Sequence, residues 1–352
     1  MNNNGTIEIF ALTEEQTALL YSFQREKIID DIKNEKNMNK RDMKRKWLTD
    51  WVKSIKNVYK EISSGNELEF SENLLRDFKS LAELSANKTW CHLVVLETEF
   101  FYPYFPLNEK SKQYKQIKYT SKNFVYSLLT RQTTPVIVKP SFVDTINKTY
   151  RKTLNKLNGT TSKIITSVAT TVAVSALTFG AASLLAGPIA VALVGSQFSG
   201  LAGAALTNAC LAYIGGGAIA VGGLGMAGGT AIIAGGGALI GLATGGSIST
   251  GVTAAIIKNP QLAISSIAKL EVVMKEIILN AQHDVASAQK ILSQYKEKIR
   301  QVEDEIEELR LKNEKYKKDI ENMKKTLEFF KKSYAEMRKY TSSFEIGLKC
   351  NE

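Results

Sequence analysis

Two clusters of basic residues in the first half of the chain carry aromatic side chains among their cations. The first cluster consists of Lys40, Arg41, Lys44, Arg45, Lys46 and Trp47. The second consists of Lys110, Lys112, Tyr114, Lys115, Lys118, Tyr119 and Lys122. Such cations can neutralise several phosphates of a polyanion, and the rings can stack on unpaired bases. The clusters therefore predict binding of single-stranded nucleic acid, with a solvated helix face or a contact with anionic lipid headgroups as the alternatives.

Net charge is concentrated in the same part of the chain. The 352 residues include 46 Lys+Arg and 35 Asp+Glu, for a formal net charge of +11. Residues 1–163 hold 27 basic and 19 acidic residues, a net of +8, whereas residues 258–352 contribute +3. A basic N-terminal region favours a polyanionic ligand or an anionic surface as its partner.

Motifs for catalysis, metals or cofactors are missing from the sequence. It has no Walker-type phosphate loop and no nucleophile elbow, and its glycines lack the acidic residue that completes a dinucleotide-binding motif. His92 and His283 stand without a Cys or acidic cluster at ligand spacing. The three cysteines are odd in number and far apart, which fits a reducing compartment. We therefore expect a protein that is not an enzyme and that needs no cofactor or metal.

The middle of the chain is apolar over an unusual length. Between Lys163 and Lys258 lie 94 consecutive residues without Asp, Glu, Lys, Arg or His, and they include 20 of the 24 glycines. The run 164–194 alone exceeds the roughly 20 residues that an α-helix needs to cross a bilayer. We expect residues 163–258 to form a membrane-spanning or membrane-inserting helical hairpin; a glycine-rich helix pair that stays buried until triggered is the soluble alternative.

Glycines recur at short intervals in the second half of this apolar segment. The positions that we expect at helix contacts or along a pore are Gly215, Gly216, Gly217, Gly225, Gly229, Gly237 and Gly241. Small residues four apart let membrane helices approach closely, which favours an oligomer over a lone anchor.

Basic residues flank the apolar segment on both sides. Arg151, Lys152 and Lys156 precede it, and Lys269 and Lys275 follow it. Positive flanks stay in the cytoplasm, so both termini are predicted to be cytoplasmic and the number of crossings to be even. No signal peptide is recognisable at the N-terminus. We expect the bacterial inner membrane as the location, with a soluble form before activation as an option.

The C-terminal region shows a heptad pattern from Val285 to Met337. Its seam includes Ile299, Ile306 and Ile320, and Asn313 is its one clearly polar position. A continuous helix of this length would extend about 80 Å. The pattern predicts a long coiled coil for oligomerisation. Bulky Tyr and Phe at seam positions leave two further options: the seam packs against N-terminal helices of the same chain, or it loosens into a larger bundle.

Helical periodicity also runs through residues 1–162. It predicts helices at 39–62, 68–84, 111–129 and 142–157, and a further helix that begins after an N-cap at Thr13 with Gln16 completing a capping box. The apolar run 90–107 fits either a buried strand or a core helix. The predicted fold is all-α with three parts: a basic helical sensor domain (1–162), the glycine-rich hairpin (163–258) and the coiled coil (259–352).

Residues 201–217 and 220–230 resemble the glycine-rich membrane segment of bacterial glycine-zipper proteins. The layout of a basic soluble domain, this segment and a coiled coil is similar to the membrane effector of the Hailong antiphage defence system. The resemblance implies an oligomeric channel that is held closed by DNA oligomers, which a partner nucleotidyltransferase makes.

These observations together predict an oligomeric pore- or channel-forming membrane effector of an antiphage system. The basic N-terminal domain would bind the gating ligand. A secreted α-helical pore-forming toxin and a membrane-anchored scaffold without a pore are the alternatives.

Overall fold

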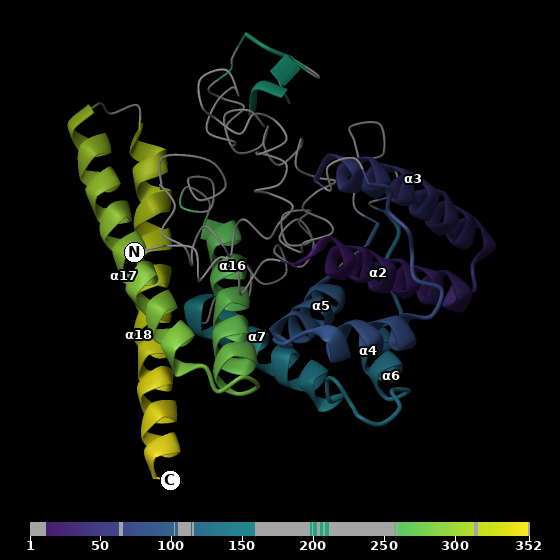
Figure 1. The fold of residues 1–352 in the computed structure, drawn as a ribbon. Coiled ribbons are helices and arrows are strands. Elements are labelled where there is room, and N and C mark those ends of the chain that lie inside the picture. Colours follow the sequence, from purple (N-terminus) through teal and green to yellow (C-terminus); the bar gives the residue numbers. More distant parts are fainter. Residues whose placement is uncertain are drawn as a thin grey trace.

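The structure is a computed structural model, and it describes residues 12–62, 66–101, 103–104, 114, 116–158, 198, 200–202, 205–206, 208–210, 257, 260–312 and 316–350. Throughout these residues the regular structure is helical, in ten helices and without a strand (Figure 1). The all-α prediction is therefore confirmed for the described part of the chain.

Six helices form the N-terminal part. They are α2 (Glu14–Asn34), α3 (Met38–Ile62), α4 (Leu74–Leu84), α5 (Thr89–Phe100), α6 (Phe124–Leu129) and α7 (Ser141–Asn158). The predicted capping box is present at the start of α2, where Thr13 Oγ1 accepts from the Gln16 backbone N–H and Gln16 Oε1 accepts from that of Thr13. The apolar run 90–107, whose periodicity was ambiguous, is helical up to Phe100 as part of α5, and its described residues after that have no regular structure.

Helix α2 is buried on opposite sides because separate cores form against it. Tyr21, Ile28 and Ile32 face Trp47 and Trp51 of α3 in one core. On the other side, α2 contributes Leu19, Leu20 and Phe23 to a core shared with α4, α5 and α6. A helix enclosed in this way holds the rest of the N-terminal part in place around it.

The N-terminal helix predicted at 111–129 is wrong at residues 117–123, and residues 111–113 and 115 lie outside the described residues. Residues 117–121 have no regular structure, and helix α6 begins only at Phe124. The physical reason is a competing set of hydrogen bonds, because the backbone N–H groups of Thr120 and Ser121 donate to the carboxylate of Asp31. The helix predicted from residue 68 likewise begins later, at Leu74, after an N-cap at Asn73.

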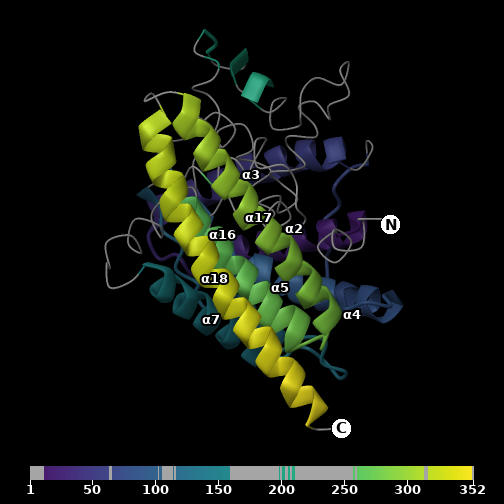
Figure 2. The ribbon, with the colours of Figure 1, turned by 90° about the vertical axis from the view of Figure 1, so that its left-hand side faces the viewer.

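Four helices follow the apolar segment: α16 (Pro260–Val272), η4 (Val273–Leu279), α17 (Val285–Lys312) and α18 (Lys317–Lys349). Helix η4 is a π-helix that continues directly from α16. Helices α17 and α18 lie side by side along their lengths (Figures 1 and 2). Contacts between them join Tyr295 to Phe330 and Glu303 to Lys331. Gln289 of α17 bonds to Glu345 of α18, whereas Tyr295, further along α17, contacts Phe330, which comes earlier in α18. The two helices are therefore antiparallel.

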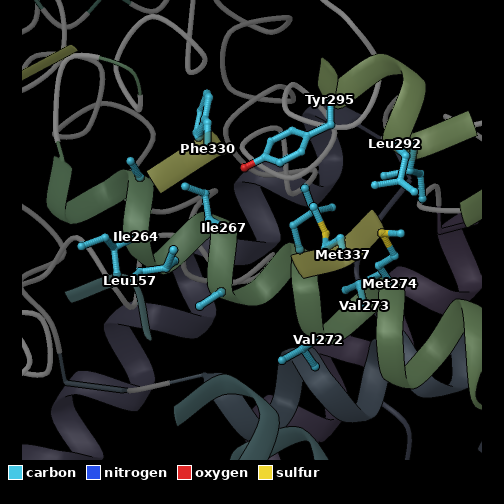
Figure 3. Close-up of a cluster of buried hydrophobic side chains, with 14 of the residues drawn as sticks. Leu157, Ile264, Ile267, Val272, Val273, Met274, Leu292, Tyr295, Phe330 and Met337 are labelled. Atoms are coloured by element: carbon cyan, nitrogen blue, oxygen red, sulfur yellow. The ribbon is translucent and has the colours of Figure 1, made fainter. Parts of the chain in front are cut away.

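The predicted single C-terminal helix is therefore wrong. The chain reverses between Lys312 and Tyr316, and the heptad seam is filled within one chain. Ile299 and Ile306 are buried in this seam, and Ile320 packs against the same core while half-buried. Asn313 lies outside the described residues. The seam packs mainly between α17 and α18 and against α16, rather than against the N-terminal helices, and Tyr295 and Phe330 contact each other between α17 and α18 (Figure 3).

The largest core joins the two ends of the chain. It contains Leu93 of α5 and Leu157 of α7 together with Ile264 and Ile267 of α16 and Met337 of α18 (Figure 3). Helix α16 and η4 lie in its centre, in contact with α5, α7, α17 and α18. The N-terminal and C-terminal parts thus share a core, although the sequence suggested separate domains.

Most of the apolar segment lies outside the described residues, and this includes Gly215, Gly216, Gly217, Gly225, Gly229, Gly237 and Gly241. Among the helices that the structure does describe, none combines the length and the apolar character needed to cross a bilayer.

Candidate functional site

The buried carboxylate of Asp31 organises the first basic cluster. Its side chain is fully buried and accepts hydrogen bonds from Lys44 Nζ at 2.6 Å and from the hydroxyl of Tyr104 at 2.7 Å. It also accepts from the backbone N–H groups of Thr120 at 2.7 Å and Ser121 at 2.9 Å. Burial opposes its charge, but the hydrogen bonds from Lys44, Thr120 and Tyr104 outweigh that effect and lower the pKa of Asp31. Asp31 is therefore an anion that ties α2 to α3 and to the segment before α6.

Several predicted ligand contacts belong to the interior instead. Lys44 is fully buried and also pairs with Glu35 at 3.0 Å. Trp47 is buried too and stacks on Trp51 with ring centroids 6.0 Å apart. Tyr114 is buried, and its hydroxyl donates to Asp50. These side chains cannot stack on a base or reach a phosphate in this conformation, because each of them is buried and has its partners inside the protein.

Other members of the clusters remain at the surface. Lys40, Lys46, Lys118 and Lys122 are exposed. Arg45 is exposed as well and pairs with Asp42 at 3.1 Å. The members of the second cluster that lie outside the described residues are Lys110, Lys112 and Lys115.

Arg41 and Tyr119 have intermediate exposure and bonds within the protein. Arg41 donates to the backbone carbonyl of Glu35 through Nε at 2.8 Å. The Tyr119 hydroxyl donates to the backbone carbonyl of Ser121, and its ring lies 4.9 Å from Lys27 Nζ. Lys27 is itself buried and donates to the carbonyls of Thr98 and Glu99 at 2.8 and 2.7 Å. Its burial lowers the pKa of the ammonium to about 8.

An open groove of about 860 Å³ lies between the C-terminal part of α2 and residues 120–131. Its polar lining includes Asp30, Asn34, Ser121, Lys122, Asn123 and Arg131. Asn34 Nδ2 donates to Ser121 Oγ at 3.2 Å and so closes one side. The hydrogen bonds from Thr120 and Ser121 to Asp31 fix the segment that presents Lys122 to this groove.

The lining of the groove carries more positive than negative charge. Lys122 and Arg131 supply two exposed cations against the single carboxylate of Asp30, and the amides of Asn34 and Asn123 add hydrogen-bonding groups. An arginine can bind a phosphate through two parallel hydrogen bonds. Sequence reasoning anticipated Lys122 only, because Arg131 is isolated in the sequence and no motif marks the two asparagines.

A second feature concerns the helices at the two ends of the apolar segment. Thr149 on α7 donates to Glu276, and Thr153, one turn later, donates to Glu271. The later threonine of α7 thus bonds to the earlier glutamate of the α16–η4 segment, so α7 is antiparallel to that segment. The last turn of α7 therefore lies beside the first half of α16, where Leu157 and Ile264 share a core.

In the described part of the chain, no group of three or more His, Cys, Asp or Glu side chains is placed to hold a metal ion. His92 packs edge-on against Phe142, and burial lowers the pKa of its imidazole.

Comparison with known proteins adds no relative. No protein-family model matches the chain, and no significant match was found to a curated protein or to a solved structure.

Proposed function

We propose that this protein is an oligomeric pore- or channel-forming membrane effector whose residues 163–258 enter the bilayer. The observation that carries the proposal is the run of 94 residues without a charged side chain or histidine. A charged residue at the centre of a membrane helix costs about 2.5–3.5 kcal/mol on insertion scales, so a segment that avoids charge over this length suits hydrocarbon.

The antiparallel contact between α7 and α16 supports a return of the segment to its starting side. The last turn of α7, before the segment, and the first half of α16, after it, lie beside each other. A segment that leaves and returns at one place crosses a bilayer an even number of times. The basic flanks then assign that side to the cytoplasm, at the bacterial inner membrane.

Subunit contacts are assigned to the glycine-rich segment rather than to the heptad seam. The seam of α17 and α18 is already filled within one chain. Gly225 and Gly229, or Gly237 and Gly241, are four residues apart and permit close helix contacts between subunits.

The groove beside Lys122 and Arg131 supplies the ligand site of the proposal. Its two exposed cations favour a phosphate-bearing ligand, for which a single-stranded nucleic acid oligomer is our candidate. The resemblance to the Hailong effector suggests that a nucleotidyltransferase makes this ligand and that the system acts against phage. No catalytic step is assigned to this chain.

The decisive experiment measures dye release from vesicles of bacterial lipid that contain the full-length protein. Wild type should release the dye. Gly229→Arg should bind less to the vesicles and release little dye, because the added charge opposes insertion into the bilayer. Leu311→Arg is the matched control, since Leu311 is 89% exposed on α17 and an added charge there meets water. Undiminished release by Gly229→Arg would refute the pore. Membrane binding without release by wild type would identify a scaffold instead.

A further inference from the structure

The helix that follows the apolar segment carries buried charges. Lys269, Glu271, Lys275 and Glu276 are all at most 7% exposed on α16 and η4, among residues that are otherwise mainly apolar. Taking a charge out of water is costly unless a partner and further hydrogen bonds compensate it. Each of these groups has such a partner, and for most of them it comes from a different helix.

Glu271 stands at the centre of this arrangement. Thr153 of α7 donates to its Oε2 at 3.0 Å, and Ser333 of α18 donates to its Oε1 at 2.8 Å. Lys275 Nζ, one turn further along, donates to Oε2 at 2.7 Å. One carboxylate thus joins the helix before the apolar segment, the helix after it and the C-terminal hairpin.

A second carboxylate closes the same circuit nearer the surface. Glu336 of α18 pairs with Lys156 of α7, and it lies 3.8 Å from Lys275 Nζ. Lys275 Nζ also lies 5.4 Å from the centre of the Tyr340 ring. Hydrogen bonds and ion pairs from Lys156, Lys275 and Ser333 therefore connect α7, η4 and α18 through charged groups.

Charged contacts of this kind add little net stability but strongly discriminate between arrangements. Apolar side chains of similar volume often stabilise a core as well or better. A small separation of α18 from α16, however, takes Ser333 away from Glu271 and Glu336 away from Lys275 while both groups are still in a dry environment. Intermediate positions are therefore disfavoured, and the contact tends to be either complete or open to water. The π-helical geometry of residues 273–279 adds to this, since π-helical turns are rare and concentrated at functional sites.

We propose that the Glu271 cluster (Glu271, Lys275, Glu336, Lys156, Thr153 and Ser333) is a releasable contact through which the α17–α18 hairpin holds together the helices at the two ends of the apolar segment. Detachment of the hairpin from α16 weakens the junction of α7 and α16, which keeps only the direct contacts between those two helices, and is the conformational step that opens the pore. The consequence for the pore rests on the proposed function, whereas the release itself does not.

The test measures the distance between α7 and α18 in the full-length protein. Spin labels are placed at two exposed positions by Asn155→Cys and Lys339→Cys, with Cys350→Ser removing the exposed thiol. The other two cysteines are buried, and burial raises the pKa of both thiols, that of Cys91 to about 12, so they label poorly. Double electron–electron resonance then gives the distance distribution, and dye release is recorded on the same samples.

Glu271→Gln keeps the size of the side chain but removes the charge that pairs with Lys275. We expect it to increase the population at longer distances by at least about tenfold over wild type, and the rate of dye release by a similar factor. Ser333→Ala, which deletes one hydroxyl, should act in the same direction and decides the matter if Glu271→Gln does not fold. Glu303→Gln is the matched control, because it makes the same chemical change in the 2.6 Å ion pair of α17 with Lys331, away from the cluster.

An unchanged distance distribution in folded Glu271→Gln or in Ser333→Ala would overturn the proposal. An equal change of the distance distribution in Glu303→Gln would also overturn it, since any loosening of the hairpin would then be enough to separate α18 from α7. Longer distances in both cluster variants, together with no dye release by any protein, would support the releasable contact and refute the pore.

Discussion

The buried pair of Asp31 and Lys44 offers a quantitative test of how the N-terminal part is held together. In Asp31→Asn the ammonium of Lys44 loses a carboxylate at 2.6 Å and keeps the one of Glu35 at 3.0 Å. Removing one partner of a buried pair costs about 3–5 kcal/mol. Glu35 and the remaining amide oxygen retain part of the interaction, so we expect a loss of about 2–4 kcal/mol in the free energy of unfolding.

Urea unfolding of the full-length protein in detergent, followed by tryptophan fluorescence, measures this loss. Trp47 and Trp51 are buried beside the pair and report its surroundings. Asp42→Asn is the control, because its ion pair with Arg45 is exposed and should change stability by less than about 1 kcal/mol. Asp31→Asn combined with Lys44→Met should cost less than the sum of the two single changes, since the fully buried carboxylate and the fully buried ammonium are then removed together. A cost of Asp31→Asn no larger than that of the control would show that this reasoning is wrong.

The same pair predicts a dependence of stability on pH. The folded-state pKa of Asp31 lies below its ordinary value of 3.8, so the folded protein holds this proton less tightly than the unfolded chain. The contribution of Asp31 to stability is complete above the unfolded pKa and is lost as the pH falls through the folded pKa. Asp31→Asn should therefore reduce the loss of stability in acid that wild type shows in the same urea experiment.

Two further predictions concern the groove and the C-terminal hairpin. Combining Lys122→Glu with Arg131→Glu should weaken binding of short single-stranded DNA or RNA in fluorescence anisotropy. The slope of log affinity against log salt concentration should become shallower by about 1.4, at about 0.7 per phosphate contact. Lys332→Glu on the exposed side of α18 is the control, and binding by the groove variant equal to that of wild type would reassign the ligand site. Ile306→Asp places a carboxylate where the side chain is 3% exposed, so unfolding by urea should become easier by at least about 3 kcal/mol, whereas Ile346→Asp at a 63% exposed position should have little effect. Normal stability of Ile306→Asp with a reduced particle mass in light scattering would show that the seam joins separate chains.

Local features were predictable from the sequence because neighbouring residues determine them. The capping box of Thr13 and Gln16 depends on four consecutive residues, and the structure confirms it. Trp47, Trp51 and Ile55 recur at helical spacing and form the buried side of α3, as their period predicts. The all-helical character of the described residues follows from the same periodicity.

The site residues were less predictable because a sequence gives residue type but not exposure. Lys44 and Lys46 look equivalent in the first cluster, yet one is buried against Asp31 and the other faces water. Arg131 has no basic neighbours to mark it and becomes part of a site only where the fold brings it near Lys122. Charge density along the chain is therefore a poor guide to charge density on the surface.

The direction of the C-terminal helices was decided by tertiary structure alone. A heptad pattern specifies which side chains are buried, and it is satisfied equally by a second chain or by the same chain folded back on itself. The choice depends on what else the seam can contact. Here α16 and η4 offer an apolar surface with buried charges, and Glu271 gains the hydroxyl of Ser333 as a partner only when α18 lies against them. The sequence by itself thus determines the apolar surfaces, the charge-free segment and the helices, whereas the pairing of those surfaces depends on contacts between residues far apart in the chain.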